Sequence, residues 1–324
     1  MIYIAGIDIG GTKCAVSIGR VENETVEILY KEKFPTPSNP NEALNKISDT
    51  LWEMLKTHQE VQLEAIGISC GGPLDSKKGL ILSPPNLPSW DKIDVITPFE
   101  ERFKVPVAVQ NDANACALAE WMWGAGKGCD NMIFLTFGTG LGAGLILDGK
   151  LYSGTNDMAG EAGHIRLEAD GPVGYGKPGS FEGFCSGGGI ARYTQGKISK
   201  WLAEGKTTSI LAEGDQLEDV TTARVGSAAA EGDELAREIW EEAGKMLGKG
   251  VAILVDILNP QRIVIGSIFL RQEALLRDPM EKMIEKEALS YNWEVCEVVP
   301  AGLKESLGDY AALSVAGDIL RKRK

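Results

Sequence analysis

A glycine turn near the start of the chain carries residue types that bind phosphate. The segment DIGGTK, residues 8–13, places an aspartate at the end of an apolar strand and follows it with two glycines, a hydroxyl and an ammonium group. Because glycine has no Cβ, the backbone N–H groups of Gly10 and Gly11 can approach an anion closely, and Thr12 and Lys13 add side-chain donors. The segment therefore predicts a phosphate-binding turn, with an ordinary tight hairpin as the alternative.

A second glycine turn repeats this arrangement later in the chain. The segment GTGLGAG, residues 138–144, again follows an apolar strand and contains Thr139. Neither turn has the GxxxxGK[ST] spacing of a P-loop, and neither has GxGxxG before a helix. Two such turns are the pattern expected of a protein that holds a nucleotide by its phosphates, and two unrelated hairpins remain the alternative.

A carboxylate lies where a strand is expected to end and a helix to begin. The segment QNDANACALAE, residues 110–120, contains Asp112 at this junction and Asn111 beside it. Asp112 could be the N-cap, since aspartate accepts bonds from the first N–H groups of a helix. The functional interpretation is a general base at the carboxyl end of a strand, where ligands bind in open α/β sheets, with Asn111 as a fixed amide.

A third group of polar residues suits a ligand with many hydroxyl groups. GEAGH, residues 160–164, and Glu182 supply two carboxylates and an imidazole among several glycines. Sugar recognition needs paired donors and acceptors, because an unpaired buried polar atom costs about 1–3 kcal/mol. His164 could also be a structural histidine. Asn86, in the proline-rich loop SPPNLPSW at 83–90, is a further candidate ligand donor.

The elements that must position these residues occur twice in a similar order. A strand at 2–9 is followed by a return strand at 13–19, a strand at 26–34, an amphipathic helix at 41–57 and a strand at 63–70. A helix near 94–103 and a strand at 105–110 come next.

The pattern restarts at 131, where TFGTGLGAGLIL echoes IDIGGTKCAVSI, so we expect duplicated halves. A long helix at 233–258, a strand at 262–267 and an alanine-rich helix at 308–320 complete it.

The length of 324 residues exceeds the size at which one core keeps growing, so two domains with a cleft are expected. We predict an N-terminal α/β domain of residues 1–118, joined by the C-terminal helix 306–324, and a C-terminal α/β domain of residues 119–305. The net charge of −13 disfavours nucleic acid as a partner.

The sequence shows no secretory leader and no run of about 18 apolar residues, so we expect no membrane association. Six cysteines without a CxxC pair suit a reducing compartment, and we expect a cytoplasmic protein.

In their order and separation, DIGGTK, SPPNLPSW, QNDANACALAE, TFGTGLGAG and GEAGH resemble the ROK family of bacterial sugar kinases and repressors. The resemblance covers nearly the whole chain. It implies the α/β, actin-like ATPase fold, a duplicated ribonuclease-H-like architecture of two domains around a cleft. It also implies ATP with Mg²⁺ as cofactors and phosphorylation of a hexose hydroxyl, expected to be C6 of glucose.

The same resemblance assigns roles to individual positions. Asp112 matches the catalytic base. The sugar contacts implied are Gly72, Asn86, Asn111, Asp112, Glu161, His164 and Glu182. The phosphate and nucleotide contacts implied are Gly10, Gly11, Thr12, Lys13, Thr139, Gly140, Gly142 and Gly266, with Asp8 near the magnesium.

The sequence departs from the family at a zinc knuckle. Many members carry CxCGxxGCxE, whose three cysteines bind zinc with the histidine of the GH pair. Here Val173, Tyr175 and Ser180 stand where the thiolates would be, and His164 alone cannot hold zinc. We predict no zinc site, and a loop held by packing through Tyr175 and Phe181.

A second departure is Ser267 in IVIGS, where paired glycines are frequent; its hydroxymethyl group is expected to crowd the nucleotide slightly.

Three other functions are consistent with the same residues. An N-acetylhexosamine kinase, such as one for N-acetylmannosamine, needs only more room beside C2 of the sugar. A non-catalytic sugar-binding regulator of the same family is expected to have lost Asp112 or the glycine turns, which are present. A repressor of this family carries a helix-turn-helix before the first strand, and this sequence begins at that strand. Members often dimerise, so a homodimer is left open.

Overall fold

The computed structural model describes residues 1–212 and 214–323. The chain forms two compact units. Unit 1 comprises 1–134, 144–159 and 301–324, and unit 2 comprises 135–143 and 160–300. The domain boundaries expected from the sequence, near 118 and 305, stay a prediction. The compact units have other bounds, because residues 119–134 and 144–159 group with unit 1.

Unit 1 is built on a five-stranded mixed sheet in the order β3-β2-β1-β4-β8. Its strands are β1 (Ile2–Ile9), β2 (Lys13–Glu22), β3 (Thr25–Pro35), β4 (Leu63–Cys70) and β8 (Val107–Asn111). The first three strands pair antiparallel, while β1, β4 and β8 run parallel. The parallel strands therefore bring their carboxyl ends, which carry Asp8 and Asn111, to one edge of the sheet.

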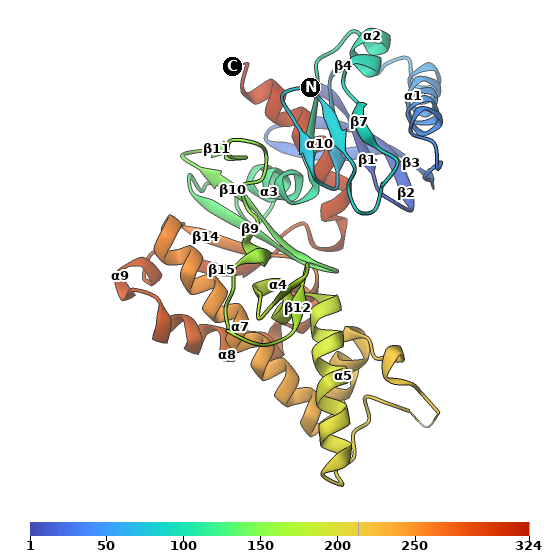
Figure 1. Ribbon diagram of the computed structural model, residues 1–324. Coiled ribbons are helices and arrows are strands. Elements are labelled where there is room, and N and C mark those ends of the chain that lie inside the picture. Colours follow the sequence, from blue (N-terminus) through green and yellow to red (C-terminus); the bar gives the residue numbers. More distant parts are fainter. Residues whose placement is uncertain (213, 324) are drawn as a thin grey trace. The chain divides into compact units, whose positions relative to one another are not determined.

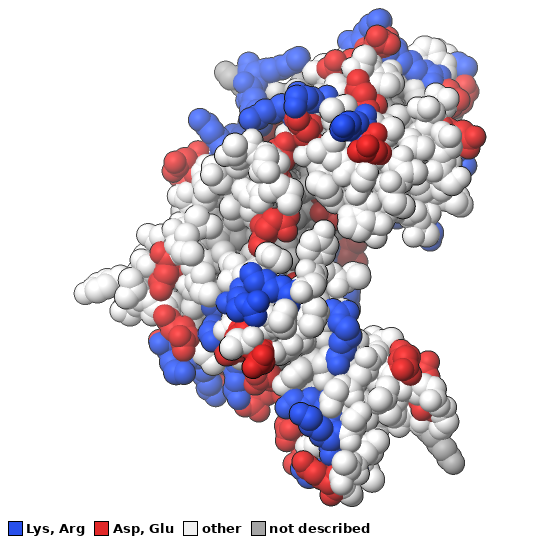
Figure 2. Space-filling view, viewed as in Figure 1, with Lys and Arg blue, Asp and Glu red and all other residues white. Residues whose placement is uncertain are grey.

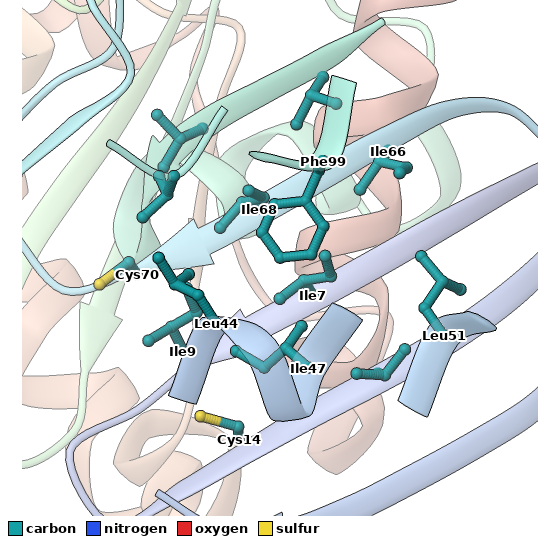
Figure 3. Packing of buried hydrophobic residues seen from close by; sticks show 14 of the residues in the cluster. Ile7, Ile9, Cys14, Leu44, Ile47, Leu51, Ile66, Ile68, Cys70 and Phe99 are labelled. Carbon is teal, nitrogen blue, oxygen red and sulfur yellow. The ribbon is translucent and has the colours of Figure 1, made fainter. Parts of the chain in front are cut away.

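Helix α1 (Pro40–Thr57) covers one face of this sheet. Its apolar residues Leu44, Ile47 and Leu51 recur at helical spacing, as expected, and are buried against Ile7 and Ile68 of the sheet (Figure 3). Asn39 caps the helix through its side chain, which accepts bonds from the first backbone amides. The amphipathic helix predicted for residues 41–57 is confirmed.

Helices α10 (Leu307–Arg321) and α3 (Asp112–Trp123) pack together, and α10 also packs on β1 and β4 (Figure 1). The approach of α10 depends on two glycines. A Cβ at Gly67 would lie 2.1 Å from the carbonyl oxygen of Ala312, and one at Gly6 would lie 2.9 Å from the amide nitrogen of Leu313. The C-terminal helix is therefore part of the core of unit 1.

A second five-stranded sheet has the order β11-β10-β9-β14-β15. Its strands are β9 (Met132–Phe137), β10 (Leu141–Leu147), β11 (Lys150–Leu151), β14 (Arg262–Ile265) and β15 (Glu297–Pro300). In both sheets the spatial order is third, second, first, fourth and fifth strand of the set. The two glycine turns each join the first strand of a set to the second. The repeated strand order is the duplication that the sequence echo predicted.

The helices of unit 2 centre on α7 (Glu234–Leu258) and α8 (Ile268–Glu287), which pack along each other (Figure 1). The predicted helix at 233–258 is confirmed, with Asp233 as its side-chain cap and Asn259 at its left-handed end. The other helices and short strands of unit 2 are α4 (Phe181–Phe184), α5 (Gly187–Ala203), α6 (Thr222–Glu231), α9 (Ser290–Trp293), β12 (Val173–Gly174) and β13 (Lys177–Pro178).

The region before β8 differs from the prediction. A helix was expected near 94–103, whereas α2 spans Thr97–Phe103 and follows the short strand β7 (Asp91–Asp94). The carboxylate of Asp94 accepts bonds from the amides of Ile96 and Thr97 at 2.9 and 3.0 Å and so starts the helix later. Strand β7 pairs with β6 (Leu80–Leu82), which pairs with β5 (Leu74–Asp75).

Lysine and arginine side chains are interspersed with acidic ones on the face shown in Figure 2. None of the helices in the described part of the chain is long and apolar enough to cross a bilayer.

Candidate active site

Asp8 is the penultimate residue of β1 and has a perturbed carboxyl group. Burial raises the pKa of Asp8 to about 6, and the negative charges of Asp112 and Asp309 act in the same direction. Lys33 and Lys31 oppose the shift, since their positive charges favour the ionised carboxylate. Asp8 therefore lies among two carboxylates and two lysines, and burial is the largest cause of its raised pKa.

Asp112 begins α3 but does not cap it. The side-chain oxygen of Asn111 accepts the bond from the amide of Asn114 at 2.7 Å and is the N-cap. The Asp112 carboxylate accepts from the amide of its neighbour Ala113 at 2.8 Å. Burial raises the pKa of Asp112 above its usual range, although bonds from the Ala113 amide and its own amide partly offset this.

Asp112 is nevertheless exposed at its surface, so the carboxylate is reachable, and the burial that raises its pKa comes from the surrounding protein and not from loss of contact with solvent. A base of this kind binds a proton more readily than an ordinary aspartate. The alternative interpretation of Asp112 as the helix cap is wrong, because Asn111 performs that role.

The first glycine turn is held by a threonine after β3. The amide of Gly10 donates to the carbonyl of Lys13 at 3.1 Å and closes the turn. The hydroxyl of Thr36 donates to the carbonyl of Gly10 at 2.6 Å, and its amide donates to the carbonyl of Thr12 at 3.0 Å. Three of the four turn carbonyls are thus engaged, which fixes the path of the backbone.

The proline-rich loop lies directly against this turn. A Cβ at Gly11 would be 2.5 Å from the carbonyl oxygen of Asn86 and 2.8 Å from its Cβ, so only glycine fits there. Trp90 is buried, and its carbonyl accepts from the amide of Ser83 at 2.8 Å, which closes the loop. Asn86 is therefore brought beside the first glycine turn by a closed loop.

Gly72 lies beside Asn111: a Cβ at Gly72 would be 3.9 Å from the Cβ of Asn111. In unit 1, Asn86 therefore packs against the glycine turn that follows Asp8. Gly72 packs against Asn111, the residue before Asp112.

The second glycine turn is held by a helix N-terminus. The amide of Gly138 donates to the carbonyl of Gly140 at 3.0 Å. The first two amides of α5, from Gly187 and Gly188, donate to the carbonyls of Gly138 and Thr139 at 2.7 and 3.4 Å. Amides that would otherwise be unsatisfied at the start of α5 therefore fix this turn.

Glu182 connects the second turn to the GEAGH segment. Its Oε2 accepts from the amide of Leu141 at 3.0 Å. A Cβ at Gly163 would lie 2.1 Å from the carbonyl oxygen of Leu141 and 3.2 Å from the Cβ of Glu182. The amide of Ala143 donates to the carbonyl of Gly160 at 2.7 Å. Three segments that are separate in sequence thus converge within unit 2, and one oxygen of Glu182 holds the backbone of the turn.

Gly266 and Ser267 lie beside the same turn, between β14 and α8. The amide of Gly266 donates to the carbonyl of Leu135 at 3.0 Å. Ser267 has φ 56° and ψ −106°, a conformation that favours glycine. Its hydroxyl accepts from Arg271 at 3.1 Å and would lie 3.6 Å from a Cβ at Gly138. The serine is therefore held in a strained conformation next to the second glycine turn.

The knuckle loop has no ligand set for zinc. Val173 and Tyr175 are 45% and 80% exposed, and the buried Ser180 uses its hydroxyl to accept from the amide of Gly183 at 3.1 Å. Within residues 1–212 and 214–323, no group of three or more histidine, cysteine, aspartate or glutamate side chains could hold a metal ion. The three side chains that stand in the place of thiolates do not fit zinc.

Packing holds only part of this loop. Phe181 is buried, and a Cβ at Gly250 of α7 would lie 2.3 Å from its ring, so the prediction for Phe181 is confirmed. The prediction for Tyr175 is wrong. Its ring projects into solvent and makes an edge contact with His164, at 6.5 Å between ring centroids.

The sequence profile of the ROK family matches residues 4–318. The chain belongs to the ROK family. The glucokinase of Streptomyces coelicolor is 32% identical over 320 residues, which cover 98% of this chain and 97% of that protein. The glucokinase of Halalkalibacterium halodurans is 34% identical over 293 residues and covers 89% of this chain and 86% of its own length.

Among solved structures, a ROK family glucokinase from Streptomyces griseus in complex with glucose and AMPPNP is 31% identical. It has a TM-score of 0.73 and covers 98% of this chain and 99% of that one. The predicted α/β, actin-like fold is confirmed by this likeness and by the repeated strand order.

Three features of this ROK protein were missed by reasoning from the sequence. Thr36 fixes the first turn, Asp309 adds charge near Asp8, and the glycine run at 187–189 fixes the second turn. Only the last had a readable signal, since Ser186 followed by three glycines is typical of a helix start with a closely approached backbone.

Proposed function

We propose that this ROK family protein transfers the γ-phosphoryl group of ATP to a hexose hydroxyl, with the C6 hydroxyl of glucose as the acceptor. The observation that carries this proposal is the state of Asp112. It lies at the carboxyl end of a parallel strand, it is relieved of helix capping by Asn111, and burial raises its pKa. The glucokinases of Streptomyces coelicolor and Halalkalibacterium halodurans, each more than 30% identical to this chain over most of its length, support the same activity.

In the proposed reaction Asp112 accepts the proton of the sugar hydroxyl as that oxygen attacks the γ-phosphorus. The oxygen–phosphorus bond forms while the bond from phosphorus to the β,γ-bridging oxygen breaks, and ADP leaves. The raised pKa of Asp112 makes its carboxylate a better proton acceptor at neutral pH. Asn111, which fixes the start of α3, sets the position of this carboxylate.

We propose further sugar contacts from residues of each unit. In unit 1 the candidates are Gly72, Asn86 and Asn111, and in unit 2 they are Glu161, His164 and Glu182. Because Oε2 of Glu182 is engaged by the Leu141 amide, we propose that Glu182 meets the sugar with its other oxygen. Asn111 uses its side-chain oxygen as a helix cap, so its amide nitrogen is the group available as a donor.

The nucleotide contacts are proposed from the two glycine turns. The candidate residues are Gly10, Gly11, Thr12, Lys13, Thr139, Gly140, Gly142 and Gly266. We propose that Asp8 holds Mg²⁺, which is bound in proteins through one or two carboxylates together with substrate phosphates. The donor fits, because burial and then the negative charges of Asp112 and Asp309 raise the pKa of Asp8, and a cation there would offset both effects. When bound, the metal neutralises charge that develops on the phosphoryl oxygens.

A coupled assay of ADP release across a panel of sugars tests the function. The panel contains glucose, mannose, fructose, allose, N-acetylglucosamine and N-acetylmannosamine, each with ATP and Mg²⁺. We expect glucose to have the highest kcat/KM, and NMR of the product to show the phosphate on C6. A higher kcat/KM for an N-acetylhexosamine would overturn the choice of sugar. Sugar binding without ADP release from any member would identify a non-catalytic regulator.

We propose a cytoplasmic location and an activity without nucleic acid. The six cysteines form no disulfide, which suits a reducing compartment. A homodimer stays a prediction, and light scattering after size exclusion would decide it.

A further inference from the structure

The loop at 171–180 connects two groups of candidate sugar contacts within unit 2. It follows the 3-10 turn of Ala162–His164 and leads directly into α4, which carries Glu182 (Figure 1). Strands β12 and β13 pair antiparallel and form a small hairpin within it. This loop therefore joins the segment that carries His164 to the helix that carries Glu182.

Apolar packing accounts for only the second end of the loop. Ser180 and Phe181 are fully buried, and the amide of Phe181 donates to the carbonyl of Ile165 at 2.8 Å. The hairpin itself projects Val173 and Tyr175 into solvent. The buried Gly174 packs against α4, but the exposed apolar side chains contribute little, so polar contacts must add to the hold on the outer part of the hairpin.

Three basic side chains donate hydrogen bonds to carbonyl oxygens in and beside the loop. The ammonium group of Lys177 donates to the carbonyl of His164 at 2.7 Å. The guanidinium group of Arg192 donates to the carbonyl of Val173 at 2.8 Å. Charged donors make the stronger class of hydrogen bond, so these contacts outweigh ordinary surface bonds.

The third donor spans the return of the loop. One nitrogen of Arg166 donates to the carbonyls of Pro178 and Ala169, at 2.8 and 3.2 Å. Residues 166 and 180 also form an isolated antiparallel bridge. Arg166 therefore closes the segment between the 3-10 turn and α4.

The three donors come from three different places. Arg192 lies on α5, Lys177 lies in the hairpin, and Arg166 follows the 3-10 turn. Together they link the helix, the hairpin and the backbone of His164. We call Arg166, Lys177 and Arg192 the basic clamp.

We propose that the basic clamp does, without a metal, the holding that a zinc knuckle would do, and that Lys177 is a positioning residue for His164. The inference rests on the proposed function for the role of His164 and Glu182. The side chains at 173, 175 and 180 do not fit zinc, whereas each clamp residue has its acceptor in place. Lys177 is the member whose bond reaches the candidate sugar contact directly.

The test compares the Lys177→Met variant with two other variants, Lys177→Arg and Lys200→Met. Methionine keeps the length and apolar stem of the side chain but removes the donor. We expect Lys177→Met to raise the KM for the sugar by about 3- to 10-fold and to change kcat by less than about 2-fold, because a displaced contact weakens binding without removing the base. Lys177→Arg keeps a donor and should return KM to within about 2-fold of the parent. Lys200→Met, at an exposed lysine on α5, is the matched control and should change neither constant.

A second readout does not depend on activity. Hydrogen–deuterium exchange of residues 162–180 should become faster in Lys177→Met, and faster again in Lys177→Met combined with Arg192→Met, with the folded core unchanged. Equal exchange in Lys177→Met and Lys200→Met would overturn the clamp. If no sugar is phosphorylated, the proposed function fails, while this readout still decides the clamp.

The metal content of the protein provides a third test of the proposal. Elemental analysis of the purified protein should find well under one zinc per chain, and dialysis against EDTA should leave exchange of the loop unchanged. One zinc per chain whose removal loosens the loop would overturn the proposal.

Discussion

The two glycine turns occupy the same place in two sheets of the same strand order, yet their surroundings differ. The strand before the first turn has Asp8 as its penultimate residue, and the strand before the second has Thr136. The first turn is fixed by Thr36, and burial and neighbouring carboxylates raise the pKa of Asp8. The second turn is fixed by the amides at the start of α5 and by Glu182.

The difference shows how a duplicated scaffold can divide labour. One turn lies beside ionisable groups that could bind a cation and accept a proton, whereas the other is surrounded by backbone amides and one carboxylate that is already engaged. We therefore expect changes at the first turn to affect charge and turnover, and changes at the second to affect geometry.

Removing the base from the first unit should have the largest effect. Asp112→Asn keeps the size of the side chain but cannot accept the proton, so we expect kcat to fall by about 10²- to 10⁴-fold. Sugar binding, measured by calorimetry, should change little. Asn111→Ala removes the helix cap and should lower the free energy of unfolding by about 1 kcal/mol, which measures what loss of the cap alone does to stability. If Asp112→Asn instead unfolds the protein, the assignment as a base is contradicted.

Adding a methyl group to each turn compares their tolerance directly. At Gly11 the new Cβ would lie 2.5 Å from a backbone oxygen, whereas at Gly140 it would lie 2.9 Å from Oε2 of Glu182, the end of a flexible side chain. We expect Gly11→Ala to lower the free energy of unfolding by about 2–3 kcal/mol and Gly140→Ala by less than about 1 kcal/mol. Urea denaturation of both variants measures this, and equal losses would contradict the comparison.

The charge of Asp8 should make stability depend on pH. The pKa of Asp8 in the folded protein, about 6, lies above its ordinary value of 3.8. The contribution of Asp8 to the free energy of unfolding is therefore highest below pH 3.8, where Asp8 is protonated in both states, and it falls as the pH rises through 6. Asp8→Asn should therefore raise the free energy of unfolding by about 1–2 kcal/mol at about pH 8, a figure reduced for partial solvent exposure, and by roughly half as much at about pH 5.

Urea titrations of Asp8→Asn and its parent without nucleotide measure this gap. The same change should lower turnover, because the candidate magnesium ligand is lost. If the difference in unfolding free energy between Asp8→Asn and its parent is no larger at about pH 8 than at about pH 5, the folded protein does not raise the pKa of Asp8.

The smallest effect is expected beside the second turn. Ser267→Gly should relieve an unfavourable backbone conformation and raise the free energy of unfolding by about 1 kcal/mol. Loss of the hydrogen bond from Arg271 to the serine hydroxyl should reduce this gain. Differential scanning calorimetry should show a rise in Tm of about 2–4 °C. A fall in Tm would mean that the serine side chain contributes more than its backbone strain costs.

The amino-acid sequence alone was sufficient to predict the strands of the first sheet, the helices α1, α7 and α10, both glycine turns and the junction that carries Asp112, whereas the long helices α5 and α8 and the strand β15 were not predicted. The predicted features depend on residues a few positions apart, because turns, caps and periodic apolar faces are local. The prediction of a duplicated fold also rested on a local echo, which the two equal strand orders bear out.

The tertiary structure decided which groups hold these features in place. Thr36 reaches the carbonyl of Gly10 from 26 residues away, and Glu182 reaches the amide of Leu141 from 41 residues away. It also decided that Asn111 caps α3, that Tyr175 is exposed and that basic side chains hold the knuckle loop. The physical reason is that a hydrogen bond between distant residues depends on how the chain packs, and the pattern of neighbouring residues does not record it.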